Sequence, residues 1–484
     1  MPLMPTFIGG AYQSRFPDLA NEALINLYLE TTQSSGAPKR AALLGTPGLR
    51  SLLTVTDASC RGQFSQDGRV WAVIGTTLYE VFPASATATA RGSVANDGHP
   101  VTFASNGRGG DQLAVCAGGF LYILATTTHT LTGPISLPFA QAVMVGFLDG
   151  YFLLLQQGTP TIWFSALEDG TSWDALDFVT RSHVSDTLVG FTIVGGRLWA
   201  FGSSTSEVFY DTGNADTPFA PYPGSVLPWG AVGPWAIAQH GLTIAWLAQN
   251  GQSTRTVMAV TFGAAPTAVS TPAIDLALNR AATLDDVEAN AYQQEGHAFV
   301  LFTVPATGET WALDLGEKTW HQRQAWTDGA FTRWRARGLC AIDGQVLAGD
   351  YETGDLYTLA LDAYDDNGAV LRRLRRAPYL SAENQWLFLD AVELGMEAGV
   401  GIGSGHGLDP QVMLRVSKDG GHTYGPVLMA PLGPQGTYGG RAIWRRIGRA
   451  RSDRLLIEVS QTDPVQAAWG PGLWLTAQAG SGQL

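Results

Sequence analysis

Arginine forms the densest group of chemistry-bearing residues in this sequence. The eleven residues from Arg441 to Arg451 contain five arginines, and Arg454 follows. Guanidinium groups bind carboxylates and phosphates through pairs of N–H donors. The segment is therefore a candidate for contact with an acidic protein surface or with DNA phosphate. Trp444, Ile447 and the apolar run that follows indicate a strand, so the alternative is a solvated strand face.

A second group of arginines follows an acidic, turn-like segment at residues 362–368. The formal net charge of the chain is −13, so general attraction to nucleic acid is not expected. We therefore rank a protein partner above DNA. The candidate subunit or partner interface comprises Arg372, Arg373, Arg375, Arg376, Arg441, Arg445, Arg446, Arg449 and Arg451.

Three other motifs suggest chemistry but favour turns. Residues 417–424 (SKDGGHTY) fit the Asp-box, a hairpin turn in which the aspartate accepts backbone N–H bonds and the aromatic residue packs beneath. The glycines of Gly399–Gly407 lack the spacing and the following helix of a dinucleotide site. Glu168, Asp169 and Asp174 could supply the two carboxylates of a glycoside hydrolase, although turn capping is the favoured interpretation.

No pattern predicts a catalytic residue, a cofactor or a metal. The eight histidines are scattered, and Cys60, Cys116 and Cys340 lie too far apart in sequence for a disulfide framework or a cysteine zinc site. Neither a phosphate-binding P-loop nor a nucleophile elbow is present. We expect a protein that is not an enzyme. No apolar run predicts a secretory signal or membrane insertion.

The elements that must position these residues repeat along the chain. Seven units begin 39 to 54 residues apart, each with apolar strands around a tight turn. Such spacing is typical of propeller blades, which bury their faces only when several close into a ring. The alternative is a run of β-sandwiches. The turns are expected at Asp67-Gly68, Asn106–Asp111, Asp149-Gly150, Gly195-Gly196, His240-Gly241, Glu295-Gly296 and Asp343-Gly344.

The predicted fold is all-β: a β-propeller of about seven blades, range six to eight, with an N-terminal arm and a C-terminal β-sandwich-like domain. The predicted boundaries are 1–50 for the arm, 51–361 for the propeller and 362–484 for the last domain. Strands from the arm could complete a blade, and Leu24–Leu29 fits a strand or a short helix. A helix is expected at Thr283–Ala291. Later strands are expected at Leu387–Leu394, Val412–Val416, Ala442–Ile447 and Leu455–Val459.

Several segments, in order, resemble the packaged-DNA stabilisation proteins of short-tailed bacteriophages, also called tail hub or nozzle proteins. The matching segments are residues 26–30 (NLYLE), 43–52 (LLGTPGLRSL), 201–213 (FGSSTSEVFYDTG), 295–305 (EGHAFVLFTVP), 311–323 (WALDLGEKTWHQR), 347–357 (LAGDYETGDLY), 409–425 (DPQVMLRVSKDGGHTYG) and 444–451 (WRRIGRAR). The resemblance covers most of the chain. The longer 399–407 loop leaves the partners of this chain open, because docking often uses insertions.

The resemblance implies a structural virion protein, made in the host cytoplasm, that lies in the phage tail. Six copies would form a ring below the portal and adaptor, extend the DNA channel and retain packaged DNA. Tail spikes, fibres or a needle or plug would dock on the ring, and double-stranded DNA would pass through it. We expect Asp, Glu, Ser, Thr and Gln to line its lumen. The alternative is a propeller glycosidase or a lectin-like module that acts on host surface polysaccharide.

Overall fold

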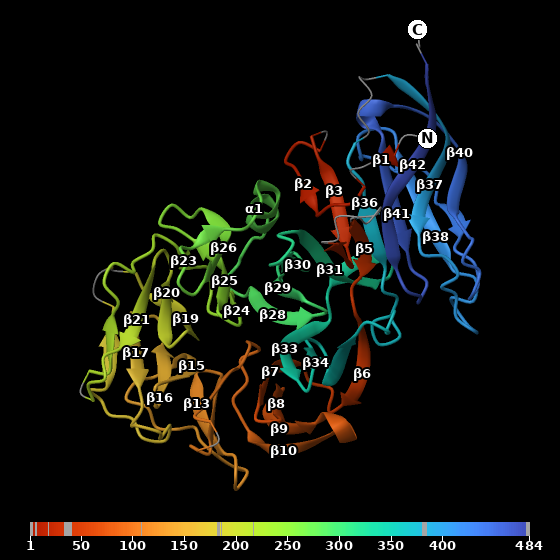
Figure 1. Ribbon diagram of the computed structural model, residues 1–484. Helices are drawn as coiled ribbons and strands as arrows, with labels where there is room; N and C mark the ends of the chain where they lie inside the picture. Colours follow the sequence, from red (N-terminus) through yellow and green to blue (C-terminus); the bar gives the residue numbers. More distant parts are fainter. Residues whose placement is uncertain are drawn as a thin grey trace.

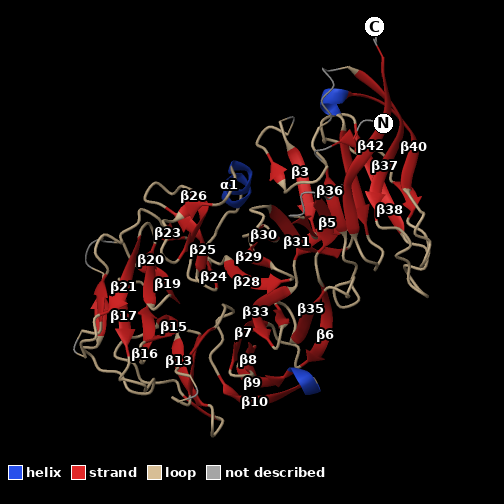
Figure 2. Cartoon of the chain, viewed as in Figure 1, coloured by secondary structure: helices blue, strands red, loops and turns tan. Residues whose placement is uncertain are grey.

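β-Strands are the dominant elements of the molecule and form a ring of sheets with a two-sheet body beside it (Figures 1 and 2). The computed structural model describes residues 3–4, 7–17, 19–32, 41–107, 109–181, 184, 186–215, 217–379 and 385–480. Within these ranges it holds one α-helix, α1 (Pro272–Asn279), and two 3-10 turns, Pro83–Ser85 and Ser452–Arg454. The all-β prediction is confirmed.

The first four blades are four-stranded antiparallel sheets of consecutive chain. Blade 1 comprises β7 (Cys60–Gln66), β8 (Arg69–Ile74), β9 (Thr77–Phe82) and β10 (Thr87–Ser93). Blade 2 comprises β11 (Thr102–Ser105), β12 (Gln112–Ala117), β13 (Phe120–Ala125) and β14 (Thr130–Thr132). Blade 3 comprises β15 (Ala142–Leu148), β16 (Tyr151–Gln156), β17 (Thr161–Phe164) and β18 (Phe178–Thr180). Blade 4 comprises β19 (Leu188–Val194), β20 (Arg197–Gly202), β21 (Ser206–Asp211) and β22 (Phe219–Pro221).

Three further blades complete a ring of seven. Blade 5 comprises β23 (Gly230–Ala231), β24 (Ile237–His240), β25 (Thr243–Gln249), β26 (Arg255–Thr261) and β27 (Thr267–Ala268). Blade 6 comprises β28 (Glu288–Gln294), β29 (His297–Val304), β30 (Glu309–Asp314) and β31 (Trp320–Thr327), and β32 (Ala330–Arg333) pairs with β31. Blade 7 comprises β33 (Ala336–Ile342), β34 (Gln345–Asp350), β35 (Asp355–Ala360) and β6 (Gly48–Thr54).

The N-terminal segment closes the ring. β6 pairs antiparallel with β35 as the outer strand of blade 7, although the two strands lie about three hundred residues apart. Neighbouring blades pack face to face through apolar clusters, and one cluster joins Val70 and Ile74 of blade 1 to Leu347 and Leu356 of blade 7. Burial of each large apolar side chain stabilises the fold by about 1.5–3 kcal/mol. The predicted seven-bladed propeller is thus confirmed.

Local turn chemistry explains most of the hairpins. Asp67 and Gly68 both adopt positive φ, 54° and 77°, as a two-residue type I′ turn requires. Of the predicted turns, one is shifted: His240 pairs with Thr243, so the turn is Gly241-Leu242. Gly241 has φ 55° and takes the first turn position, a left-handed conformation that glycine adopts without strain. Residue 108, inside the predicted Asn106–Asp111 loop, lies outside the described residues.

The second body is a β-sandwich. One sheet runs β4 (Leu27–Thr31), β5 (Ala41–Gly45), β42 (Ala468–Gly480), β37 (Trp386–Met396) and β40 (Ala442–Arg451), with β1 (Leu3–Met4) on β42. The other contains β3 (Asn21–Ile25), β36 (Arg373–Arg376), β41 (Leu456–Gln461), β38 (Gln411–Ser417) and β39 (Leu428–Pro431), with β2 (Tyr12–Gln13) on β3. The four strands predicted after residue 361 correspond to β37, β38, β40 and β41.

The propeller and the sandwich share a sheet. β3 pairs with β31 of blade 6 on one side and with β36 on the other, so one eleven-stranded sheet continues from blade 6 into the sandwich. In Figure 1 the red N-terminal strands β3 and β5 lie among the teal and blue strands of the C-terminal part. β6 spans the predicted boundary at 50/51, and β3 and β5 pair with β36 and β42, which follow the predicted boundary at 361/362. These boundaries stay predictions.

The helix predicted at Thr283–Ala291 is wrong. Residues 288–294 form β28, because the Glu295-Gly296 turn folds them onto the apolar strand β29. The helix α1 lies earlier in the chain, where Pro272 occupies its first turn and the Thr271 hydroxyl accepts a hydrogen bond from the Ile274 amide (3.4 Å). Threonine before proline is a helix-start signal. The prediction chose the wrong threonine.

Candidate interaction site

Two of the nine predicted interface arginines are enclosed by the chain. The Arg375 side chain is fully buried, donates to the Phe7 carbonyl (2.7 Å) and pairs with Glu22 (3.0 Å). Arg373 is 1% exposed, and burial lowers its pKa to about 10. Both guanidiniums hold the sandwich together internally. A contact surface, which stays a prediction, would therefore have to use the other seven arginines.

Arg372 and Arg376 are half-buried and have partners within the chain. The Arg372 guanidinium lies 4.2 Å from the ring centroid of Trp326, a cation–π contact with blade 6. Arg376 pairs with Glu458 at 3.0 Å, and Glu458, 1% exposed, also binds Arg415. A buried carboxylate needs such cations to offset its desolvation. The cationic segment 372–376 therefore mainly stabilises the sandwich and its contact with blade 6.

The remaining five arginines are exposed: four lie on β40, the edge strand of its sheet, and Arg441 directly precedes it. Arg445 and Arg446 are both exposed because a β-bulge interrupts the ladder there and Arg446 adopts φ 60°. Arg441 pairs with Glu393 at 3.2 Å. The predicted strand is confirmed, and among the described residues no further strand pairs with its outer edge.

A pocket of about 550 Å³ lies at the end of β40. We call it the β40 pocket. Lys418 and Arg454, which sequence reasoning did not include in the interface, bring two further cations to it. Asp453 is the one carboxylate in this lining. The pocket is lined by Trp386, Lys418, Arg449, Arg451, Asp453 and Arg454.

The Asp-box forms the turn that its sequence predicts. Asp419 accepts hydrogen bonds from the amide of Thr423 (2.9 Å) and from the hydroxyl of Ser417 (2.7 Å). The hydrogen bonds from Thr423 are the main reason why the pKa of Asp419 lies below its usual range. Tyr424 packs against the guanidiniums of Arg376 (5.4 Å) and Arg415 (5.0 Å). The motif therefore orders the turn that carries Lys418 into the β40 pocket.

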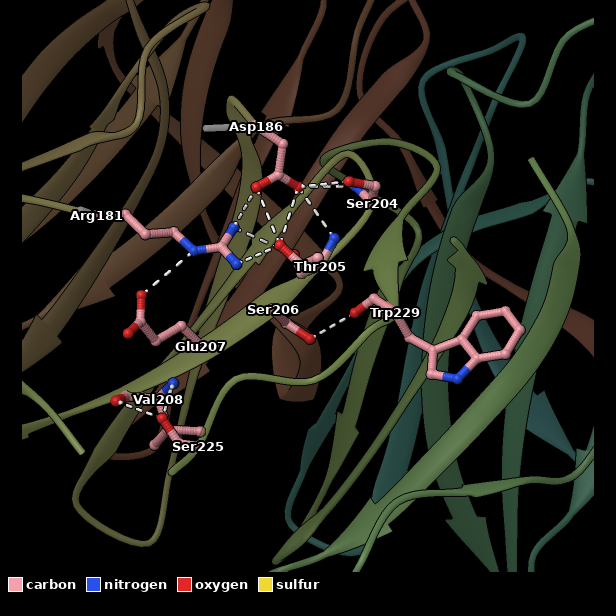
Figure 3. A network of polar contacts seen from close by, with 9 residues as sticks. All are labelled: Arg181, Asp186, Ser204, Thr205, Ser206, Glu207, Val208, Ser225 and Trp229. Atoms are coloured by element: carbon pink, nitrogen blue, oxygen red, sulfur yellow. Dashed lines mark hydrogen bonds and ion pairs between the residues drawn. The ribbon is translucent and has the colours of Figure 1, made fainter. Parts of the chain in front are cut away.

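The segment 201–213 forms a polar network in blade 4 (Figure 3). Its centre is Arg181, which lies between Asp186 (2.9 Å) and Glu207 (3.3 Å) and is fully buried. Asp186 also accepts the backbone N–H groups of Ser204 (2.9 Å) and Thr205 (3.0 Å). Burial alone would raise the pKa of Asp186, but these bonds and Arg181 outweigh it and lower the pKa. The network fixes the β20–β21 hairpin to the preceding loop.

Asn26 is a junction residue that sequence reasoning did not single out. It is fully buried, adopts φ 54° and lies between β3 and β4. Its side-chain amide donates to the carbonyls of Gln324 and Arg372, both at 2.8 Å, and accepts the Gln324 amide at 3.0 Å. One side chain thus fastens blade 6 to the sandwich. The sequence indicated Asn26 only as the first residue of segment 26–30 (NLYLE), one of the segments that carry the family resemblance.

His297 joins the same two bodies through charge. Its ring nitrogens contact Asp314 of β30 (2.5 Å) and Glu30 of β4 (2.7 Å). Burial alone would lower its pKa, but the two carboxylates outweigh burial and raise the pKa above 6.5. The protonated ring can donate to both carboxylates at once. This arrangement supplies a pH-dependent contact between blade 6 and the sandwich.

The acids considered for glycoside hydrolysis lie in turns. Asp169 accepts the Thr171 amide (2.9 Å), and Asp174 accepts the Leu176 amide (2.9 Å). Glu168 is exposed and adopts φ 58° in the same loop. These contacts are those of turn capping.

Among the described residues, no three His, Cys, Asp or Glu side chains gather into a group that could hold a metal ion. No helix in the described part of the chain is long and apolar enough to cross a membrane.

Comparison with known families gives two matches that together span nearly the whole chain. Residues 3–364 match the family model described as "Bacteriophage P22 Gp10, beta-propeller". Residues 372–466 match the model described as "Bacteriophage P22 Gp10, beta-sandwich". No curated protein matches the sequence.

Three solved structures also match, at low identity. The designed Ika8 protein is 10% identical, with 70% of this chain and 100% of that chain covered and a TM-score of 0.38. U3-55K is 9% identical, with coverages of 65% and 99% and a TM-score of 0.40. The N-terminal domain of Nup159 is 10% identical, with coverages of 70% and 99% and a TM-score of 0.42. These TM-scores lie below 0.5, so the fold assignment rests on strand pairing and on the two family models.

Proposed function

Because the chain belongs to the family of bacteriophage P22 Gp10, a structural tail protein, we propose that it is the subunit of a tail ring. Six copies lie below the portal and adaptor and extend the channel through which DNA leaves. The ring retains packaged DNA, and tail spikes, fibres or a plug dock on it. The observation that carries this proposal is the match of both bodies, propeller and sandwich, to one tail-protein family.

The dimensions of one subunit support a channel formed between copies. The cavity at the propeller centre is lined by strands of all seven blades and measures about 300 Å³. Duplex DNA has a major groove about 12 Å wide, so the whole duplex cannot enter such a cavity. A DNA conduit built from this chain therefore needs several subunits around a common axis.

The charge distribution supports a conduit that does not hold DNA. Residues 1–361 contain 17 Lys and Arg against 30 Asp and Glu. An acidic propeller facing the lumen repels phosphate, so DNA meets no general attraction as it passes. We expect the lumen to be lined mainly by Asp, Glu, Ser, Thr and Gln.

Electron microscopy of intact tails tests the proposal. The expected image is a six-fold ring of propellers between the adaptor and the tail tip, with this chain located by an antibody or a fused tag. Tails that lack the chain, or that hold it outside the channel axis, would contradict the proposal. A strongly basic lumen in the reconstructed ring would contradict the conduit argument separately.

A further inference from the structure

We propose that the β40 pocket receives a carboxylate-bearing surface of the neighbouring copy in the ring. This inference rests on the proposed ring and names the contact between its subunits. The pocket is the cationic half of the contact, and the acidic propeller of the next copy supplies the other half.

The shape and lining of the pocket fit such a contact. Four cations line it against one carboxylate, Asp453. The guanidiniums of Arg449 and Arg451 lie 5.3 Å and 5.5 Å from the ring centroid of Trp386. Arginine and tryptophan are the residue types most often found at the energetic centre of protein interfaces. The pocket is therefore built like an interface centre.

Three of the four pocket cations are poorly neutralised by the described part of their own chain. Within the described residues, Lys418, Arg449 and Arg454 have no carboxylate within ion-pair distance. The Lys418 ammonium lies close over the backbone of Gly448, where an added Cβ would come within 3.0 Å of it. Glycine thus leaves room for the ammonium at the pocket wall.

The charge of the chain is divided between its two bodies. Residues 362–484 contain 12 Lys and Arg against 12 Asp and Glu, so the whole net charge of −13 belongs to residues 1–361. Six of the twelve cations in the C-terminal part lie between Arg441 and Arg454. One molecule therefore presents both a cationic edge and an acidic surface.

A closed ring of identical subunits can use this division. Each subunit of such a ring contacts its two neighbours through two different surfaces, which must complement each other. Opposite charges on the two surfaces speed docking and fix its register. The cationic edge and the acidic propeller are two such surfaces on one chain.

A neighbouring copy fits the pocket better than DNA does. Duplex DNA would bring a continuous line of phosphates to a molecule that carries net charge −13. A local carboxylate surface of the next copy needs only the pocket and the adjoining strand edge.

Charge reversal in the pocket tests the inference with a matched control. The pocket variant is Lys418→Glu with Arg454→Glu. The control is Lys318→Glu with Arg280→Glu, which makes the same change at two exposed cations of the propeller part. Both are introduced into the full chain, and folding is checked by circular dichroism and thermal unfolding. If the pocket variant does not fold, Arg449→Gln with Arg454→Gln replaces it.

Each protein is supplied during infection to a phage that lacks its own copy, and ring occupancy in purified tails is counted by electron microscopy. We expect the pocket variant to lower occupancy about tenfold or more, because charge pairs at an interface centre are lost. The control should match the wild type. Wild-type tails without a ring would overturn the proposed function itself. Normal rings with the pocket variant would overturn only this inference.

Three further readouts separate a neighbouring copy from other occupants. A pocket variant keeps its acidic surface, so it can bind a wild-type neighbour but cannot receive the next copy. Mixed with wild type at a minor fraction, it should therefore stop ring closure. If rings form normally while affinity for a duplex DNA oligonucleotide falls, the pocket binds phosphate and the inference is wrong. The inference is also wrong if rings form normally and the tails lack only a spike or fibre.

Discussion

At the scale of single residues, Asn26 and His297 add polar contacts between blade 6 and the sandwich to the shared sheet and core. Asn26 uses its amide to bind two carbonyls and one N–H group from segments that lie about three hundred residues away. A buried polar group stabilises only while all its partners are present. The consequences can be measured at Asn26 and at His297.

Asn26→Asp should destabilise the protein by about 3–5 kcal/mol, because it places a carboxylate against the two carbonyls that the amide now serves. The control is Asn367→Asp, at an exposed residue that also adopts positive φ, 52°. We expect a change of at most about 0.5 kcal/mol there. Urea unfolding followed by tryptophan fluorescence measures both. Equal midpoints for the two variants would show that the junction bonds contribute nothing.

The His297 contact should make stability depend on pH. The folded-state pKa lies above the ordinary value of 6.5, so the stabilisation is complete below about pH 6.5 and is lost as the pH rises through the folded pKa. Calorimetry of wild type and His297→Gln should therefore show the largest difference in Tm near pH 5.5 and a smaller one near pH 8.5. Glu30→Gln should reduce this dependence. A difference that grows with pH would contradict the contact.

At the scale of elements, closure of the ring depends on two glycines that flank the β6 pairing. A Cβ on Gly48 would lie 2.2 Å from the Asp365 carbonyl oxygen, and a Cβ on Gly354 would lie 2.0 Å from that of Thr56. In both cases the contacting atom belongs to the backbone, so the strand itself must move to make room for the added Cβ.

Gly48→Ala and Gly354→Ala should each destabilise the protein by about 1–3 kcal/mol, the scale of overpacking. They should also make residues 1–54 more sensitive to protease, since β6 separates from β35. Gly251→Ala is the control, because Gly251 has no atom within 4 Å of an added Cβ. Limited proteolysis with mass spectrometry, beside urea unfolding, gives the comparison. Unchanged cleavage would show that the ring does not depend on tight closure there.

Sequence reasoning succeeded where structure is decided locally. The Asp-Gly and Gly-Gly turns were located because positive φ restricts the residues that a turn accepts. The Asp-box and the strand at Ala442–Ile447 were found for similar reasons. The pairing of β3 with β36 was not predicted, because its partners lie far apart in sequence and neither strand alternates clearly. The burial of Arg375 was not predicted. Cationic side chains are rarely buried unless they have partners, and the sequence does not show those partners.

The candidate site was predicted in part. The exposed arginines of β40 follow from their density in the sequence. The β40 pocket does not, because Trp386, Lys418 and Arg454 come together only when three separate segments fold against one another. Composition could suggest a cationic surface, but only the fold shows its concave shape.

At the scale of the whole molecule, the propeller and the sandwich are one unit because the N-terminal segment belongs to both. The sandwich takes β3, β4 and β5 from residues 21–45, and the propeller takes β6. Sandwich and blades 5 and 6 also share one continuous apolar core. We expect the two bodies to move together.

The C-terminal fragment 362–484 should therefore not fold alone. It lacks β3, β4 and β5, which extend both of its sheets. The fragment would therefore expose unpaired strand edges. A fusion of residues 1–47 to 362–484 through a flexible linker should restore the native fold. Circular dichroism and amide-proton dispersion by NMR compare the two proteins. A folded fragment with a stability equal to that of the fusion would contradict the argument.

The position of β6 has a further consequence for the newly made chain. A ribosome that adds about 5–20 residues per second needs roughly 15–60 seconds to reach β35 after β6 has been synthesised. During that interval blades 1 to 6 can form, but the ring stays open. β3 waits still longer for β36, since Asn26 and Arg372 are 346 residues apart. An incomplete nascent chain therefore presents neither a closed propeller nor a finished sandwich.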